Sequence, residues 1–150
     1  MKALSRYAVL AVAAGTGLTL AIAPSASAAA SSPVIAVVTG PSGLEIPSPC
    51  TGAEISTTGQ LKLSTITNGT HTIAGIADSE SGDGYTFVEV GAAAFNSLAS
   101  SYTVPAVGVW VNQADPALSF HASLTATISV NASNAPTGVL THTVQRTCGL

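Results

Sequence analysis

The side chains best suited to chemistry in this 150-residue chain are four carboxylates in the stretch DSESGDGYTFVE, residues 78–89. They are Asp78, Glu80, Asp83 and Glu89. A calcium loop presents oxygen ligands at alternating positions, a glycine at its sixth position and a bidentate glutamate at its twelfth. Glu89 fills the twelfth position, but the sixth is Asp83, and the glycines flank it. The stretch therefore predicts either a weak calcium site or an acidic, solvated turn shaped by Gly-Asp-Gly.

Three aromatic residues are candidates for binding a ligand: Tyr85, Tyr102 and Trp110. Tyr85 and Tyr102 each begin an expected strand, where a ring can line the rim of a site while its hydroxyl stays hydrated. Trp110 lies among valines in VGVWV, a context that is also typical of a buried tryptophan. We therefore expect Tyr85 and Tyr102 to line the rim of a ligand site and Trp110 to be buried in the core, with an exposed ring that stacks on a ligand as the alternative for Trp110.

Motifs for catalysis or a bound cofactor are missing from the sequence. His71, His121 and His142 lack the short paired spacing of zinc ligands. The chain has no GxSxG nucleophile elbow, phosphate loop or dinucleotide fingerprint. A serine–histidine–acid triad is defined by geometry rather than by sequence order, so a small secreted hydrolase remains a remote alternative. We expect no enzymatic activity and, apart from the calcium hypothesis, no cofactor.

Alternation of apolar and polar residues predicts that β-strands position these side chains. In residues 118–130 the apolar side chains fall on one face, while serine, threonine and histidine fall on the other. Residues 139–148 are predicted to form the returning strand of a hairpin, after a loop at 131–138. Other segments rich in β-forming residues are also expected to be strands: 33–38, 53–57, 85–90 and 102–111.

A second hairpin is predicted at Asn68-Gly69, because Asn-Gly strongly favours a two-residue turn. Pairing Thr67 with Thr70 places four apolar residues on one face, where we expect the core: Leu61, Leu63, Ala74 and Ile76. The segment 91–101 is the one plausible helix. Seven or eight short strands predict an all-β fold, either an antiparallel β-sandwich of the immunoglobulin-like type or a small β-barrel.

The N-terminal segment predicts export. Two basic residues precede an uncharged apolar run, and Pro24 with several small residues follows it, which is the layout of a secretory signal peptide. We assign residues 1–28 to this helical signal peptide, residues 29–49 to a flexible N-terminal segment, and residues 50–150 to a single all-β domain. The expected location is secreted or extracytoplasmic, including association with the cell wall.

Charge and cysteine content restrict the partners and support this location. After the signal segment, two basic residues stand against seven acidic ones, a net charge of −5, which excludes a basic surface for nucleic acid or anionic membranes. Two cysteines in an exported chain predict a disulfide. A Cys50–Cys148 bridge would join the first and last segments of the domain. A catalytic thiol or metal thiolate is the alternative.

Four short motifs stand out along the chain: CTGAEI (50–55), NGTHT (68–72), GDGYTF (82–87) and RTCGL (146–150). Together they resemble those of a group of small exported actinobacterial β-proteins with a single disulfide between the N- and C-terminal regions. The resemblance implies export, an all-β domain and the terminal bridge, and it implies no activity.

These features predict a non-catalytic β-domain that acts at the cell envelope or outside the cell. Its partner would be a wall polymer, an envelope protein or a small ligand. Low surface charge and uncharged β-prone segments such as SLTATISV (123–130) also allow a second function, self-assembly into a surface layer or fibre.

Overall fold

Residues 32–150 are described by a computed structural model, and the predicted signal peptide lies outside them. In this range the chain forms seven long strands and one short 3₁₀ helix, η1 (Pro116–Leu118). The strands are β1 (Val34–Pro47), β2 (Glu54–Asn68), β3 (His71–Gly82), β4 (Tyr85–Phe95), β5 (Ser101–Asn112), β6 (Phe120–Val130) and β7 (Pro136–Cys148). The all-β prediction is confirmed.

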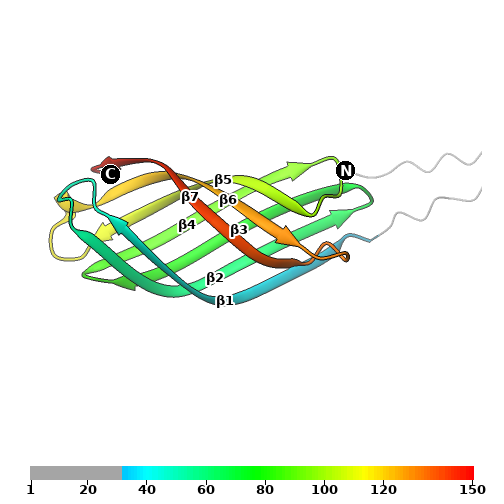
Figure 1. Cartoon of the computed structure of the whole chain (residues 1–150), viewed down its shortest axis with the longest axis horizontal. Coiled ribbons are helices and arrows are strands. Elements are labelled where there is room, and N and C mark those ends of the chain that lie inside the picture. The colour runs from blue at the N-terminus through cyan, green and yellow to red at the C-terminus, as the bar shows by residue number, and fades with distance from the viewer. Residues whose placement is uncertain (1–31) are drawn as a thin grey trace, which may run out of the picture.

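All seven strands belong to one antiparallel sheet, and they follow one another in chain order. The sheet curls so that β1, β6 and β7 cross in front of the strands behind them, which gives two facing layers (Figure 1). This meander differs from the Greek-key connections of an immunoglobulin domain. β1 and β7 are the two edge strands and are not hydrogen-bonded neighbours. We call the line along which these two edges approach each other the seam.

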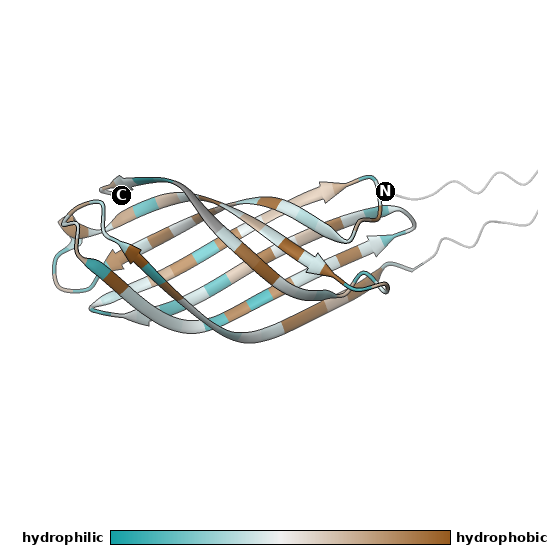
Figure 2. Ribbon diagram, in the orientation of Figure 1, coloured by the Kyte–Doolittle hydropathy of each residue, from teal (hydrophilic) through white to brown (hydrophobic). Residues whose placement is uncertain are grey.

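The core fills the space inside the curl, where the inner faces of the two layers meet. Its side chains alternate with outward-facing residues along β2 to β6 (Figure 2), as period-two geometry requires. The predicted core residues Leu63, Ala74 and Ile76 are buried, and Leu61 is half-buried beside them. At the end of the molecule where η1 lies, Trp110 stacks between Phe87 and Phe120, with ring centroids 4.1 and 4.9 Å away.

Two tight turns fix the register of β2, β3 and β4. The first has Gly69-Thr70 as its central pair, since Asn68 pairs with His71. The Asn68-Gly69 turn predicted from the sequence is therefore displaced by one residue, because the positive φ of 62° belongs to the glycine at the first central position. The two interior faces are unchanged by this displacement. In the second turn Asp83 and Gly84 both have positive φ, 47° and 76°, as a type I′ turn needs.

Two segments differ from their predicted structure. Residues 39–47, expected to belong to a flexible segment, continue the strand predicted at 33–38, so that β1 pairs with β2 along its whole length. An edge strand tolerates Pro41, because its missing N–H is not needed by a second neighbour. Residues 91–95, expected to be helical, extend β4 up to Phe95. Here pairing with β3 outweighs the helix propensity of alanine.

Close packing of β2 against β3 predicts a large effect for one glycine. A Cβ atom at Gly59 would lie 1.9 Å from the carbonyl oxygen of Ser79, whereas a Cβ at Gly40 would meet nothing within 4 Å. We expect Gly59→Ala to destabilise the protein by about 2–3 kcal/mol, because backbone atoms must move. The control Gly40→Ala should change stability by less than about 0.5 kcal/mol. Urea unfolding measures both, and equal stabilities would contradict the strand spacing described here.

Candidate functional site: an acidic cleft at the seam

Three carboxylates project into the interior of the curled sheet. Asp78 and Glu80 lie two residues apart on β3, so they share its inner face. Glu89 on β4 pairs directly with Asp78 across the two strands. The residues are only 7, 3 and 1% exposed. Like charges directly opposite one another in a sheet are destabilising, and burial of charged groups adds to the free-energy cost. When ionised, the cluster therefore destabilises the folded state.

Hydrogen bonds satisfy only part of this cluster. The Ser42 hydroxyl on β1 donates to Asp78 Oδ1 over 2.7 Å, and the Thr57 hydroxyl on β2 donates to Glu80 Oε2. The other oxygen of Glu80, Oε1, and Glu89 Oε1 are buried without a hydrogen-bond partner among the described atoms. Buried polar atoms in proteins nearly always have a partner, supplied by the protein, water or a ligand. Two buried acceptor oxygens on the neighbouring strands β3 and β4 therefore have no hydrogen-bond partner.

A cleft of about 300 Å³ connects these carboxylates to the seam. Asp78, Glu80 and Glu89 lie on its inner side, and Pro41–Leu44 of β1 and Val139–Thr141 of β7 form its two edges. Leu61 completes the wall. None of the described side chains that line the cleft is basic, so it combines apolar walls with concentrated negative charge.

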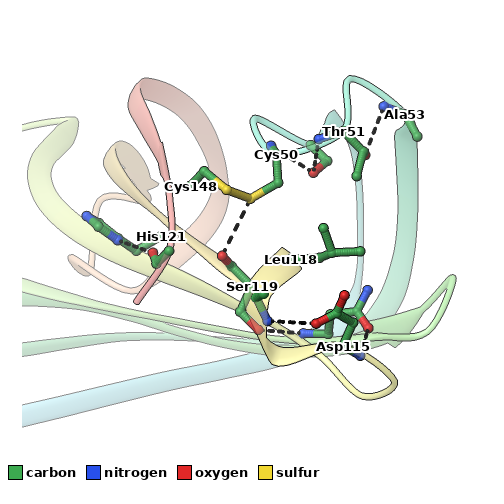
Figure 3. Close-up of a disulfide and its surroundings, with 12 residues drawn as sticks. Cys50, Thr51, Ala53, Asp115, Leu118, Ser119, His121 and Cys148 are labelled. Carbon is green, nitrogen blue, oxygen red and sulfur yellow. Dashed lines mark hydrogen bonds between the residues drawn. A yellow bond between two sulfur atoms is a disulfide. The ribbon is translucent and has the colours of Figure 1, made fainter.

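The seam is held closed on one side of this cleft. The predicted Cys50–Cys148 disulfide is present and joins the β1–β2 loop to the end of β7 (Figure 3), and no free cysteine occurs in the part of the chain described. Arg146 Nη1 also donates to the Pro47 carbonyl oxygen over 2.5 Å. After the bridge, Gly149 N donates to the Ser119 carbonyl oxygen over 2.9 Å. These contacts anchor the last residues of the chain.

A polar network fills the opposite end of the interior. Asn134, in the β6–β7 loop, receives a hydrogen bond from the Tyr102 hydroxyl at Oδ1 over 2.8 Å. Its side-chain amide donates to Thr72 and Thr67, and its carbonyl oxygen accepts from the Thr65 hydroxyl over 2.6 Å. The loop is thereby tied to β2, β3 and β5. Along β7, the cleft lies between this network and the disulfide.

Burial and like charge perturb the acidity of two of the carboxylates. Desolvation, together with the charges of Asp78 and Glu80, raises the pKa of Glu89 from 4.5 to about 7. Burial also raises the pKa of Glu80, although the hydrogen bond from Thr57 acts in the opposite direction. Near neutral pH, Glu89 is therefore balanced between a proton donor and an anion, and a nearby positive charge would shift it toward the anion.

The predicted four-residue calcium loop does not form. Asp83 lies in the exposed turn between β3 and β4, where its Oδ2 accepts from the Ser56 backbone N–H over 2.7 Å. Within residues 32–150 no three or more His, Cys, Asp or Glu residues are arranged to hold a metal ion. The solvated-turn alternative is also wrong for Asp78, Glu80 and Glu89, because all three face inward.

The three aromatic residues that are candidates for binding a ligand belong to the core. Tyr85, Tyr102 and Trp110 are 7, 1 and 1% exposed. The Tyr102 hydroxyl donates to Asn134, and the Trp110 ring stacks against neighbouring rings. The Tyr85 hydroxyl donates to the Leu118 carbonyl oxygen over 3.4 Å. The predicted rim position of Tyr85 and Tyr102 is thus corrected, and the burial expected for Trp110 is confirmed, since each ring falls on the inward phase of its strand. Ser42 and Thr57, which bind the carboxylates, were not among the predicted site residues.

Comparisons with known proteins give no indication of function, so we infer a function from the cleft. No family model, curated protein or solved structure matches the chain. No helix in the described range is long and apolar enough to span a membrane. Chemically, the cleft can accept hydrogen bonds, neutralise a cation or exchange a proton at Glu89.

Proposed function

We propose that this protein is an extracytoplasmic, non-catalytic β-domain that binds a small ligand in the seam cleft. The observation that carries the proposal is the pair of buried, unpartnered oxygens, Glu80 Oε1 and Glu89 Oε1, in residues that line an apolar cleft. Because both oxygens are covered, a ligand that enters between β1 and β7 would reach these acceptors only when the residues lining the cleft move apart. Its binding would offset the cost of burying three acidic groups together.

The extracytoplasmic location rests on two observations of different kinds. The N-terminal sequence has the layout of a signal peptide, and the Cys50–Cys148 disulfide is compatible with an oxidising compartment. Attachment to the cell wall or secretion into the medium is part of the same proposal.

Binding without catalysis fits the depth of the carboxylates. Asp78, Glu80 and Glu89 lie on the inner wall of a narrow cleft and are nearly fully buried. A bond within a long polymer would not reach them, whereas a small molecule or a single side chain can. A wall polymer would therefore present one terminal or pendant group to the cleft.

NMR amide shifts test whether the cleft is a binding site for any ligand chemistry. We would add n-butylammonium chloride, sodium butyrate, n-butanol and calcium chloride separately to isotope-labelled protein. The proposal predicts that at least one probe shifts the amides of Ser42–Leu44 and Val139–Thr141 together and saturably, while Gly69-Thr70 in the distant turn stays unchanged. No saturable shift at the seam with any of the four would contradict the proposed function.

A second candidate function, self-assembly, is favoured by the outer face of β4 and β5. Val88 and Val90 lie opposite Val109 and Val107 across these strands, and Val111 extends the patch. Four of these five valines are exposed by 37–57%. If copies associate through this face, sedimentation velocity should show oligomers at high protein concentration that Val107→Lys reduces. A monomer at all concentrations would contradict this second function.

A further inference from the structure

We propose that the cleft recognises a primary alkylammonium group, with the cation at the carboxylates and its carbon chain along the seam. This inference rests on the proposed binding function and specifies its ligand class. The source of the group can be a free amine or the side chain of a lysine in a protein or peptide partner.

Charge is the first argument for a cationic ligand. Three acidic side chains line one cleft, and no described side chain that lines it is basic. Lys62, one of two basic residues outside the signal segment, is exposed on the outer face of β2, and Arg146 is engaged by the Pro47 carbonyl. An anion would meet uncompensated repulsion, whereas one positive charge would relieve the repulsion between Asp78 and Glu89, which pair directly.

Hydrogen bonding distinguishes an ammonium group from a metal ion. An ammonium carries three N–H donors and no acceptor, and Glu80 and Glu89, which line the cleft, each keep one buried acceptor without a partner. Calcium needs six to eight oxygen ligands around one point. The described acidic residues are not arranged as a metal site, and Ser42 and Thr57 already occupy one oxygen each of Asp78 and Glu80.

The walls of the cleft account for the alkyl chain. Leu44, Leu61, Val139 and Leu140 line it together with the carboxylates, and contact with them would remove apolar surface of the ligand from water. A volume of about 300 Å³ is at the lower end of the range for small-molecule pockets, about 300–1,000 Å³. It suits a short linear chain better than a ring system or a folded peptide.

Isothermal titration calorimetry at pH 8 tests this ligand class. The probes are n-butylammonium chloride, n-butanol, sodium butyrate and calcium chloride at equal ionic strength. We expect n-butylammonium to bind at least about tenfold more tightly than n-butanol and butyrate, because charge-assisted hydrogen bonds are lost with the neutral and anionic analogues. A second series compares n-butylammonium with Nα-acetyl-lysine amide, which separates a free amine from a lysine side chain as the source.

Glutamate-to-glutamine variants, which keep the side-chain shape, test which carboxylates contribute to n-butylammonium binding. Glu89→Gln and Glu80→Gln should each weaken n-butylammonium binding about tenfold or more, whereas Glu54→Gln, on the exposed start of β2, should not change it. Thermal unfolding of each variant confirms that it is folded. Because the carboxylates must be ionised to bind a cation, affinity should also fall between pH 8 and pH 6.

The outcomes distinguish a wrong ligand class from a cleft that binds no ligand. Preferential binding of n-butylammonium that depends on Glu80 and Glu89 supports the ligand class. Tighter binding of butyrate, n-butanol or calcium at the same cleft overturns the ligand class and leaves the binding function standing. Absence of binding by every probe, with no amide shift at the seam, overturns both.

Discussion

Replacing both Cys50 and Cys148 with alanine is expected to lower the free energy of unfolding by about 3–4 kcal/mol. The bridge joins residues separated by 98 positions, and closing a loop of about 100 residues restricts the unfolded chain by up to about 4.7 kcal/mol in the chain-entropy model. We place the effect below that limit because the unfolded chain keeps some residual structure. For a domain of about 120 residues, this loss is a large share of the total stability.

Urea unfolding of the oxidised and reduced protein measures this effect. The wild type should lose stability when dithiothreitol is added, whereas the Cys50→Ala, Cys148→Ala double variant should be insensitive to it. Cys50 Sγ lies 3.6 Å from the Ser119 carbonyl oxygen, so we expect the start of β6 and the end of β7 to lose protection from hydrogen exchange first. Identical unfolding curves with and without reductant would contradict a stabilising role for the bridge.

Glu89→Gln is expected to stabilise the protein by about 2 kcal/mol at pH 8 and to have little effect at pH 5. The pKa of Glu89 rises from 4.5 to about 7 on folding. Between these values the native state binds more protons than the unfolded state, so stability is highest below about pH 4.5 and falls as the pH rises to about 7. Each tenfold change in an acid constant corresponds to about 1.4 kcal/mol, and water at the cleft mouth screens part of this cost.

Chemical unfolding between pH 4 and pH 8.5 tests the linkage. The wild type should lose stability across this range relative to Glu89→Gln, and the two proteins should converge at the acidic end. The exposed-site variant Glu54→Gln should follow the wild type at every pH. A Glu89→Gln variant that is less stable than the wild type at pH 8 would show that the charged carboxylate is stabilised in the native state, against the environment described here.

Local patterns were sufficient to predict much of the fold. Alternation identified the inward faces of β2, β3 and β6, because one side of each strand is buried and the other is wet. The bridge between Cys50 and Cys148 was predicted because an exported chain meets oxidising conditions and this chain has two cysteines. Even the turn displaced by one residue at Gly69 kept the correct faces, because moving a hairpin turn by one position changes the pairing by two residues.

The site was harder to predict because its parts come from distant segments. Asp78 and Glu80 continue the inward phase of Ala74 and Ile76, and this parity was the one signal in the sequence that they face the core. Acidic residues beside glycines suggested a solvated turn instead, because carboxylates are rarely buried. The contact from Ser42 spans 36 residues, and the approach of β7 to β1 depends on the curl of the whole sheet, which no local pattern encodes.

The outward expectation for Tyr85 and Tyr102 failed for a related reason. Rings at strand starts are placed at a rim only if the strand ends are open. Here Asn134 covers Tyr102 at one end, and Phe120 covers Trp110 and packs 5.9 Å from Tyr85, measured between ring centroids, at the other. The loops that close the two ends decide the role of these residues.

Measuring the titration of the Glu89 side-chain carboxyl by carbon-13 NMR tests the central claim most directly. For the free protein we predict a pKa of about 7, and saturating n-butylammonium chloride should lower it, because a cation beside the carboxylate favours its charged form. The exposed carboxyl of Glu54 serves as the internal control and should not respond to the amine. A Glu89 carboxyl that titrates at its usual value near 4.5 and ignores the amine would contradict a buried acidic cleft that binds cations.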